Sequence, residues 1–221
     1  MRIEPLALQA AAAIAAVAAG TLFAAIQFIH PPDELASVTT PAWALVAALT
    51  LAMAILGLAG VSGAYLRQAR RSGVPGLAGF LLLAAFYLLT AMVMFVEALV
   101  LPVTAEEAPG ITIDFIALAG GGEVTGDLGA LTALGPLSGV LFMGGGVLFG
   151  VGLWRSRVQP RWVAVLIGLG ALVPLATSFL PHELHRFAAL PFALALIGLG
   201  LTWRPRRGRT DSSPRSEAAV V

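Results

Sequence analysis

The residues best suited to chemistry in this chain are its histidines and the carboxylates near them. The sequence holds three histidines, and two of them stand in "LPHELHR" as His182 and His185, with Glu183 between them. If a helix begins at Pro181, His182 and His185 are spaced i, i+3 and share one face. Imidazole with carboxylate is a typical ligand set for zinc or copper, and facing histidines can hold a haem. The stretch is not the H-E-x-x-H motif of zinc proteases.

Three further polar residues lie in apolar surroundings before this motif. His30 ends a long apolar run, and Gln27 stands one helical turn before it, on a face continued by small residues. Glu97 lies about 7 to 8 Å deeper than Pro102 by helical rise. A carboxylate at that depth is costly unless it faces the protein interior, a partner or water, so Glu97 is a candidate for function. We therefore expect Gln27, His30 and Glu97 to point into a bundle.

Three interpretations of these residues remain open. His30, His182 and His185 could bind a metal or haem, with Glu97 or Glu183 as general acid or base. Glu97, Gln27 and Glu183 could instead form a proton or small-ligand site. The interpretation that we favour is polar packing inside a bundle, because Pro, Asp and Glu are also ordinary helix-start residues.

The composition places these residues in a membrane protein. Of 221 residues, 58% are hydrophobic and only 11% charged, far from the balance of a soluble domain. A transmembrane helix needs about 20 mainly apolar residues, and alternating barrel-type patterning is absent. We predict an all-α polytopic bundle, residues 1–203, with six transmembrane helices at residues 5–29, 41–66, 76–103, 134–154, 162–180 and about 184–203.

The distribution of arginine predicts the orientation. Basic residues in short loops mark the cytoplasmic side, and here they follow the second, fourth and sixth segments, with only Arg186 on the opposite side. Both termini should therefore be cytoplasmic, and the acidic loops should lie outside. Trp43 is expected as an interfacial anchor at the outer boundary. Residues 204–221 are rich in Arg, Ser and Pro and are expected to be a disordered basic tail, which we interpret as a topology signal and headgroup anchor rather than a nucleic-acid site.

The glycines predict close helix packing. Gly57, Gly60 and Gly63, and later Gly146 and Gly150, remove side chains so that helix backbones can approach. A tight bundle is favoured over a water-filled pore, and the Gly-rich helices could also contact a second copy or a partner membrane protein. "GGGEVTGD" (residues 120–127) lacks the ending of a phosphate loop. The preceding "ITIDFIALAG" is too short to span, and we interpret it as an interfacial helix or a lid over the outer face.

Several stretches carry a resemblance. "IQFIHPPDELASVTTPAW", "YLRQAR", "QPRW" and "LPHEL" resemble segments of uncharacterised multi-pass membrane proteins of high-GC bacteria. The resemblance covers nearly the whole chain except the tail. It implies a location in the bacterial inner (plasma) membrane and no particular activity or site.

Two functions follow as expectations. The first is an integral membrane protein without its own catalysis, acting as an accessory, small-ligand-binding or permeation component. The alternative is a membrane-embedded enzyme or redox protein with an outer-face His/Glu site that depends on zinc, copper or haem.

Overall fold

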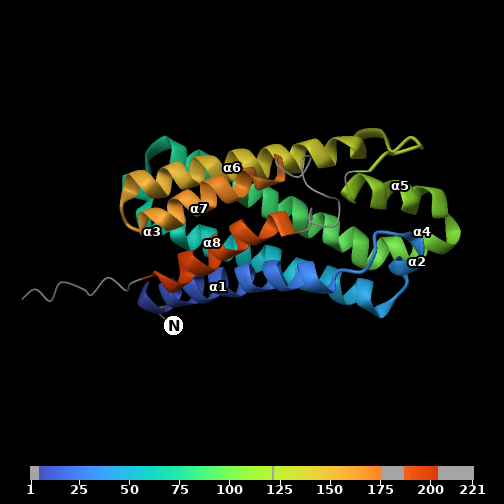
Figure 1. Cartoon of the computed structure of the whole chain (residues 1–221), viewed down its shortest axis with the longest axis horizontal. Helices are drawn as coiled ribbons and strands as arrows, with labels where there is room; N and C mark the ends of the chain where they lie inside the picture. The colour runs from blue at the N-terminus through green and yellow to red at the C-terminus, as the bar shows by residue number, and fades with distance from the viewer. Residues whose placement is uncertain (1–4, 121, 176–186, 204–221) are drawn as a thin grey trace, which may run out of the picture.

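The computed structural model describes residues 5–120, 122–175 and 187–203, and all regular secondary structure in these ranges is helical. Helix α1 (Pro5–Ile29) is followed by the short α2 (Leu35–Val38) and the long α3 (Pro41–Phe95). A π-helical turn η1 (Val96–Val100) leads into α4 (Leu101–Glu107) and α5 (Pro109–Gly120). The chain continues through a 3-10 turn η2 (Gly129–Ala133) into α6 (Leu134–Ser156), α7 (Arg161–Leu172) and α8 (Leu190–Leu201). Figure 1 shows them as one elongated bundle.

Three stretches are long and apolar enough to cross a membrane, namely Ala7–Ile29, Pro41–Glu107 and Gly129–Ser156. The second of these, 67 residues long, contains a reversal at Gly73. Gly73 has φ 63° and ψ −165°, a conformation essentially restricted to glycine. Pro75 follows it, in the first turn of the returning arm, where a proline is tolerated. The chain therefore runs to one end of the bundle and turns back (Figure 1), as the separate predictions for 41–66 and 76–103 require.

The last two predicted segments, residues 162–180 and about 184–203, fall partly outside the described residues. Helices α7 and α8 have 12 residues each, and with the flanking turns they form apolar stretches at Arg161–Leu175 and Phe187–Leu201. Residues 176–186, which connect these two stretches, lie outside the described residues, and so does the basic tail, residues 204–221. Helix α1 covers the predicted segment and ends at the predicted residue, Ile29.

Glycines bring the helices together along the bundle. A Cβ on Gly60 would lie 2.9 Å from the Ala16 Cα of α1, and one on Gly20 would lie 2.5 Å from the Ala193 carbonyl oxygen of α8. Gly146 and Gly150 of α6 face α7 in the same way, the latter at 2.8 Å from the Ala164 carbonyl oxygen. The predicted close packing is confirmed for these glycines within the chain, whereas contact with another chain stays a prediction.

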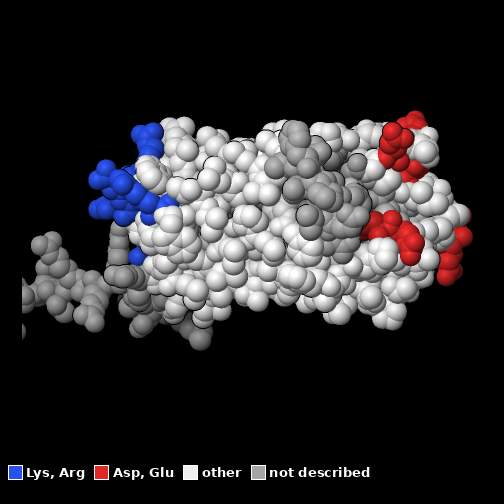
Figure 2. Space-filling model, viewed as in Figure 1, with Lys and Arg blue, Asp and Glu red and all other residues white. Residues whose placement is uncertain are grey.

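The two ends of the bundle carry opposite charge. Figure 2 shows the basic side chains of this face gathered at one end and the acidic ones at the other. The basic end contains the start of α1, the turn at Gly73 and the end of α8, while α2, α4 and α5 form the acidic end (Figure 1). This separation along the long axis agrees with the charge pattern read from the loops.

Candidate functional site: two chambers at the acidic end

The π-helical turn at the acidic end has an identifiable cause. In η1 the Leu101 N–H bonds to the Val96 carbonyl, one residue further back than in an α-helix. The Glu97 carbonyl would next need the N–H of residue 102, but that residue is proline and has none. Its oxygen instead accepts a hydrogen bond from the indole Nε1 of Trp43, at 3.1 Å. This bond joins the start of α3 to the turn that follows its returning arm.

A cavity of about 260 Å³, which we call the polar chamber, lies beside this turn. Its walls come from α1, the start of α3, η1 and α5. Six of its lining residues carry polar side chains: Gln27, His30, Asp33, Trp43, Thr50 and Glu97. Met53, Ile26 and Ile116 contribute apolar surface. The chamber therefore combines residues that are far apart in the sequence.

A second cavity of about 330 Å³, which we call the apolar chamber, lies against the first. It is bounded by the returning arm of α3, by α5 and by the start of α6, and most of its wall is apolar: Phe86, Leu89, Val93, Phe115, Leu118 and Leu134. Met94, Glu97 and Ala119 line both chambers. Glu97 thus places an ionisable carboxyl group on the wall that they share.

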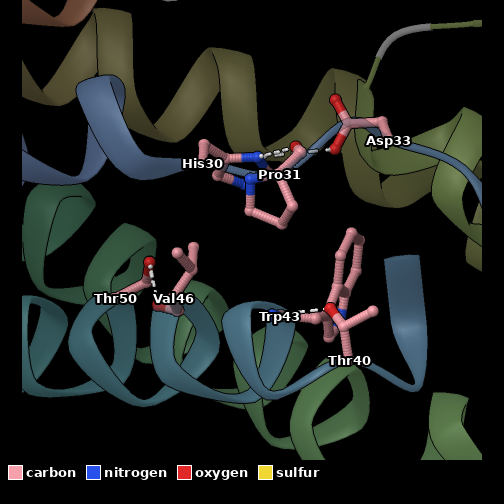
Figure 3. Close-up of polar contacts among 7 residues, drawn as sticks. All are labelled: His30, Pro31, Asp33, Thr40, Trp43, Val46 and Thr50. Atoms are coloured by element: carbon pink, nitrogen blue, oxygen red, sulfur yellow. Dashed lines mark hydrogen bonds and ion pairs between the residues drawn. The ribbon is translucent and has the colours of Figure 1, made fainter.

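His30 is held at the rim of the polar chamber. Its Nδ1 lies 2.8 Å from the Pro31 carbonyl oxygen, and because a carbonyl can only accept, Nδ1 carries the proton. The same nitrogen is 3.7 Å from Asp33 Oδ1, and the ring meets the Trp43 ring edge-on at a centroid distance of 6.1 Å. Figure 3 shows His30 and Asp33 on the segment after α1, across from Trp43 and Thr50 of α3.

Helix α5 covers both chambers and is fastened by Asp114. The Asp114 carboxylate accepts three hydrogen bonds, from the Thr125 N–H and hydroxyl at 2.9 and 3.0 Å and from the Gly126 N–H at 2.9 Å. The Thr125 backbone bond, together with these others, holds the pKa of Asp114 below its usual value. A Cβ on Gly126 would lie 2.5 Å from Asp114 Oδ2, so this glycine permits the approach.

This geometry explains the segment that superficially resembles a phosphate loop. Backbone N–H groups of "GGGEVTGD" do bind an anion, but it is the chain's own Asp114. Two residues before Asp114 in α5, the Thr112 hydroxyl donates to Thr104 Oγ1 of α4 at 2.8 Å. Phe115 and Ile116 pack with Trp43, Leu101 and Val38 in a small hydrophobic cluster separate from the main core. Helix α5 is therefore a fixed cover over the chambers.

The structure brings together some of the residues singled out from the sequence. Gln27, His30 and Glu97 all line the polar chamber, and a ligand role for them stays a prediction. His182, Glu183 and His185 lie outside the described residues, so the three-histidine site also stays a prediction. Within residues 5–120, 122–175 and 187–203, no group of three His, Cys, Asp or Glu is placed to hold a metal ion.

Sequence reasoning missed the role of Trp43. We expected an interfacial anchor, but the side chain is only 4% exposed and bonds to the Glu97 carbonyl. The available signal was Pro102, which leaves a carbonyl in the preceding turn without a donor. Its partner is 54 positions away in the sequence, so the spacing could not reveal it.

No protein-family model, curated protein sequence or solved structure matches this chain. The fold and the site define it as a helical bundle with three stretches able to span a membrane and a two-chambered hollow at its acidic end.

Proposed function

We propose that the chain is an integral protein of the bacterial inner membrane, with six spans, cytoplasmic termini and the acidic end outside. The reversal at Gly73 divides the longest apolar stretch into two arms, and α7 and α8 would complete the six spans. Large apolar side chains are exposed along the sides of the bundle, among them Ile14, Ile55, Leu81, Leu88, Val140 and Leu169. Such a surface suits a lipid bilayer, and the charge separation supports the orientation.

Single cysteines test the topology, because the chain has none of its own. Cysteine in place of Glu106 or Asp127 should react with a membrane-impermeant maleimide added to intact cells. Cysteine in place of Arg71 or Arg157 should react only after the membrane is broken. The reverse pattern would overturn the orientation, and labelling at all four positions in intact cells would overturn the membrane-spanning arrangement.

Within that membrane protein, the function that the geometry supports best is non-catalytic binding of a small ligand. The observation that carries it is the pair of chambers, about 260 and 330 Å³, that meet at Glu97. Each is at or near the lower end of ligand-site volumes. Ten residues before Glu97, in the returning arm of α3, Tyr87 is 2% exposed and packs on Gly57, where a Cβ would lie 2.5 Å from its ring. This packing favours a closed binding site over an open permeation path.

Binding is tested with six-carbon probes on protein in lipid nanodiscs. Hexylamine, hexan-1-ol and hexanoate are titrated by calorimetry, and at least one should bind saturably at one site. Ala119→Trp adds bulk at an exposed position shared by both chambers and should abolish that binding. Ala48→Trp, at an exposed position of α3 outside both linings, is the control for partition into lipid. Absence of saturable binding by all three probes would overturn the proposal.

A metal or haem protein is the second candidate. One observation favours it: Phe187, the first described residue after the unassigned histidine segment, packs on Phe28 at a centroid distance of 5.5 Å. Phe28 is close to His30 in the chain, and α1 packs along α8. Near-stoichiometric metal or a haem absorption band, lost in the His30→Ala, His182→Ala, His185→Ala triple variant, would establish this candidate. Protein prepared without chelator that carries neither would remove it.

A further inference from the structure

The chemistry of the two chambers specifies a class of ligand. We propose that the site binds an amphiphilic organic cation, whose ammonium group bonds to Glu97 in the polar chamber and whose apolar chain fills the apolar chamber. The inference rests on the proposed ligand-binding function and names its substrate class.

The first argument is the state of the hydrogen-bond donors in the polar chamber. The Trp43 indole N–H is engaged by the Glu97 carbonyl, and the Thr50 hydroxyl donates to the Val46 carbonyl at 2.8 Å. Figure 3 shows the Thr50 bond, together with the one that engages His30 Nδ1. The Gln27 Nε2 donates to the Phe23 carbonyl at 3.0 Å. A ligand that needs donors, such as a carboxylate or phosphate, would find most of them already taken.

The acceptors in the same chamber are available. Thr50 Oγ1 and Gln27 Oε1 keep lone pairs, and His30 Nε2 is an acceptor when the ring is neutral. Among the described residues, the Glu97 carboxylate takes part in no hydrogen bond or ion pair. A group with several N–H donors complements this wall, and an ammonium group has three.

The second argument is charge. A carboxylate in apolar surroundings needs a cationic partner or a hydrogen-bond donor to offset its desolvation. The other acid that lines the polar chamber is Asp33, which lies beside His30. The acidic side chains at this end (Figure 2) also raise the local concentration of cations.

The third argument is the position of Glu97 between two different walls. On one side of it are the polar groups described above, and on the other are aromatic and aliphatic side chains such as Phe86, Phe115 and Leu118. The Thr90 hydroxyl, on the apolar side, is engaged by the Phe86 carbonyl at 3.0 Å. A bare or hydrated metal ion would leave this apolar volume unfilled, whereas a short alkyl or aryl chain attached to an ammonium group would fill it.

The three probes separate the charge from the chain. Hexylamine and hexan-1-ol have nearly the same shape, and we expect the amine to bind at least about tenfold more tightly than the alcohol, with hexanoate weakest. Lengthening the amine from butyl to hexyl should tighten binding about fourfold per methylene group, the factor for transferring CH₂ out of water. Equal binding of hexylamine and hexan-1-ol, or no gain with chain length, would overturn the inference.

Variants at Glu97 locate the charge preference. Glu97→Gln should abolish the preference for the amine while leaving the binding of hexan-1-ol within about twofold, which also shows that the variant folds. Glu97→Asp, which keeps the charge, should keep the preference. Glu107→Gln removes an exposed carboxylate at the same end and should change it less than twofold. An amine preference that survives Glu97→Gln would overturn the assignment.

The two proposals fail in distinguishable ways. Suppose that hexan-1-ol or hexanoate binds, that Ala119→Trp abolishes this binding, and that hexylamine is not preferred. The proposed ligand site would then be retained, and the inference that its ligand is a cation would be overturned. Absence of saturable binding by all three probes to the unmodified protein would overturn both proposals.

Discussion

Some polar side chains at the acidic end of the bundle have hydrogen-bond partners of a different kind from those at the basic end. At the basic end, polar groups bond across helices: the Ser156 hydroxyl of α6 donates to Gln68 Oε1 of α3 at 2.7 Å, and Gln68 is 2% exposed. At the acidic end, the hydroxyl of Thr50 and the amide of Gln27 bond to the backbone of their own helices. Their remaining acceptors face a cavity instead of a partner.

The two ends also differ in how closely the helix backbones approach one another. Near the basic end α3 and α6 touch at Gly76 and Gly152, and a Cβ on Gly76 would lie 3.5 Å from the Gly152 Cα. Near the acidic end, glycines of α6 such as Gly139 have ordinary or open surroundings. We conclude that close packing at one end stabilises the bundle, which allows the other end to remain hollow.

The largest expected effect is on the stability of the fold and comes from adding a methyl group at Gly79, in the half of the bundle near the basic end. A Cβ on Gly79 would overlap the backbone of Phe149, and that backbone has no side-chain freedom to give way. Gly79→Ala should therefore destabilise the fold by about 3 kcal/mol or more, the upper range for overpacking. Thermal unfolding in detergent, followed by size-exclusion fluorescence, measures the loss.

The matched control is the same change at the acidic half. A Cβ on Gly139 would lie 3.5 Å from the Met143 Cε, an ordinary contact with a flexible side chain. Gly139→Ala should be neutral or stabilise the helix by about 0.5 kcal/mol, because alanine restricts the unfolded chain more than glycine does. Equal losses at the two positions would contradict the contrast between the ends.

A smaller effect is expected from the hydrogen bond between α3 and α6. Ser156→Ala leaves the buried Gln68 amide without this donor, which should cost about 1–3 kcal/mol. Adding Gln68→Leu removes the buried amide as well, so the double variant should lose less than the sum of the two single losses. Chemical unfolding measures the coupling, with Thr21→Ala, an exposed hydroxyl bonded to its own helix, as the control. Additive losses would show that the bond does not join the helices.

The sequence predicts the parts of this contrast that depend on local chemistry. Apolar length predicts α1 and its end at Ile29, and arginine spacing indicates which ends of the helices lie together. The chambers depend instead on contacts between distant segments: Trp43 reaches Glu97 across 54 positions, and α5 is fixed by Asp114 binding a loop that follows it. Helix periodicity places Glu97 on the inward face but carries no information on the space beside it.

The smallest expected effect concerns the attachment of α5, the helix that covers both chambers at the acidic end. Asp114 has a lowered pKa in the folded chain because its carboxylate accepts bonds from Thr125 and Gly126. A lowered carboxyl pKa contributes stability above its unfolded value, about 3.9, and this contribution is lost as the pH falls through the lower folded value. Exchange of the Thr125 and Gly126 amides, followed by mass spectrometry, should therefore accelerate only in acid, beyond the intrinsic pH dependence of exchange.

Asp114→Asn removes this charge and one acceptor oxygen. At neutral pH the variant should exchange these amides several-fold faster than the unmodified chain, and its protection should no longer change across the acid range. Asp127→Asn, which alters an exposed carboxylate bonded to the Gly129 N–H at 2.8 Å, should leave them unchanged. Unaltered protection in Asp114→Asn would mean that α5 is held by its hydrophobic contacts and the Thr112–Thr104 hydrogen bond without Asp114. Because α5 lines both chambers, faster exchange should be accompanied by weaker hexylamine binding, which would connect the stability of the cover to the site beneath it.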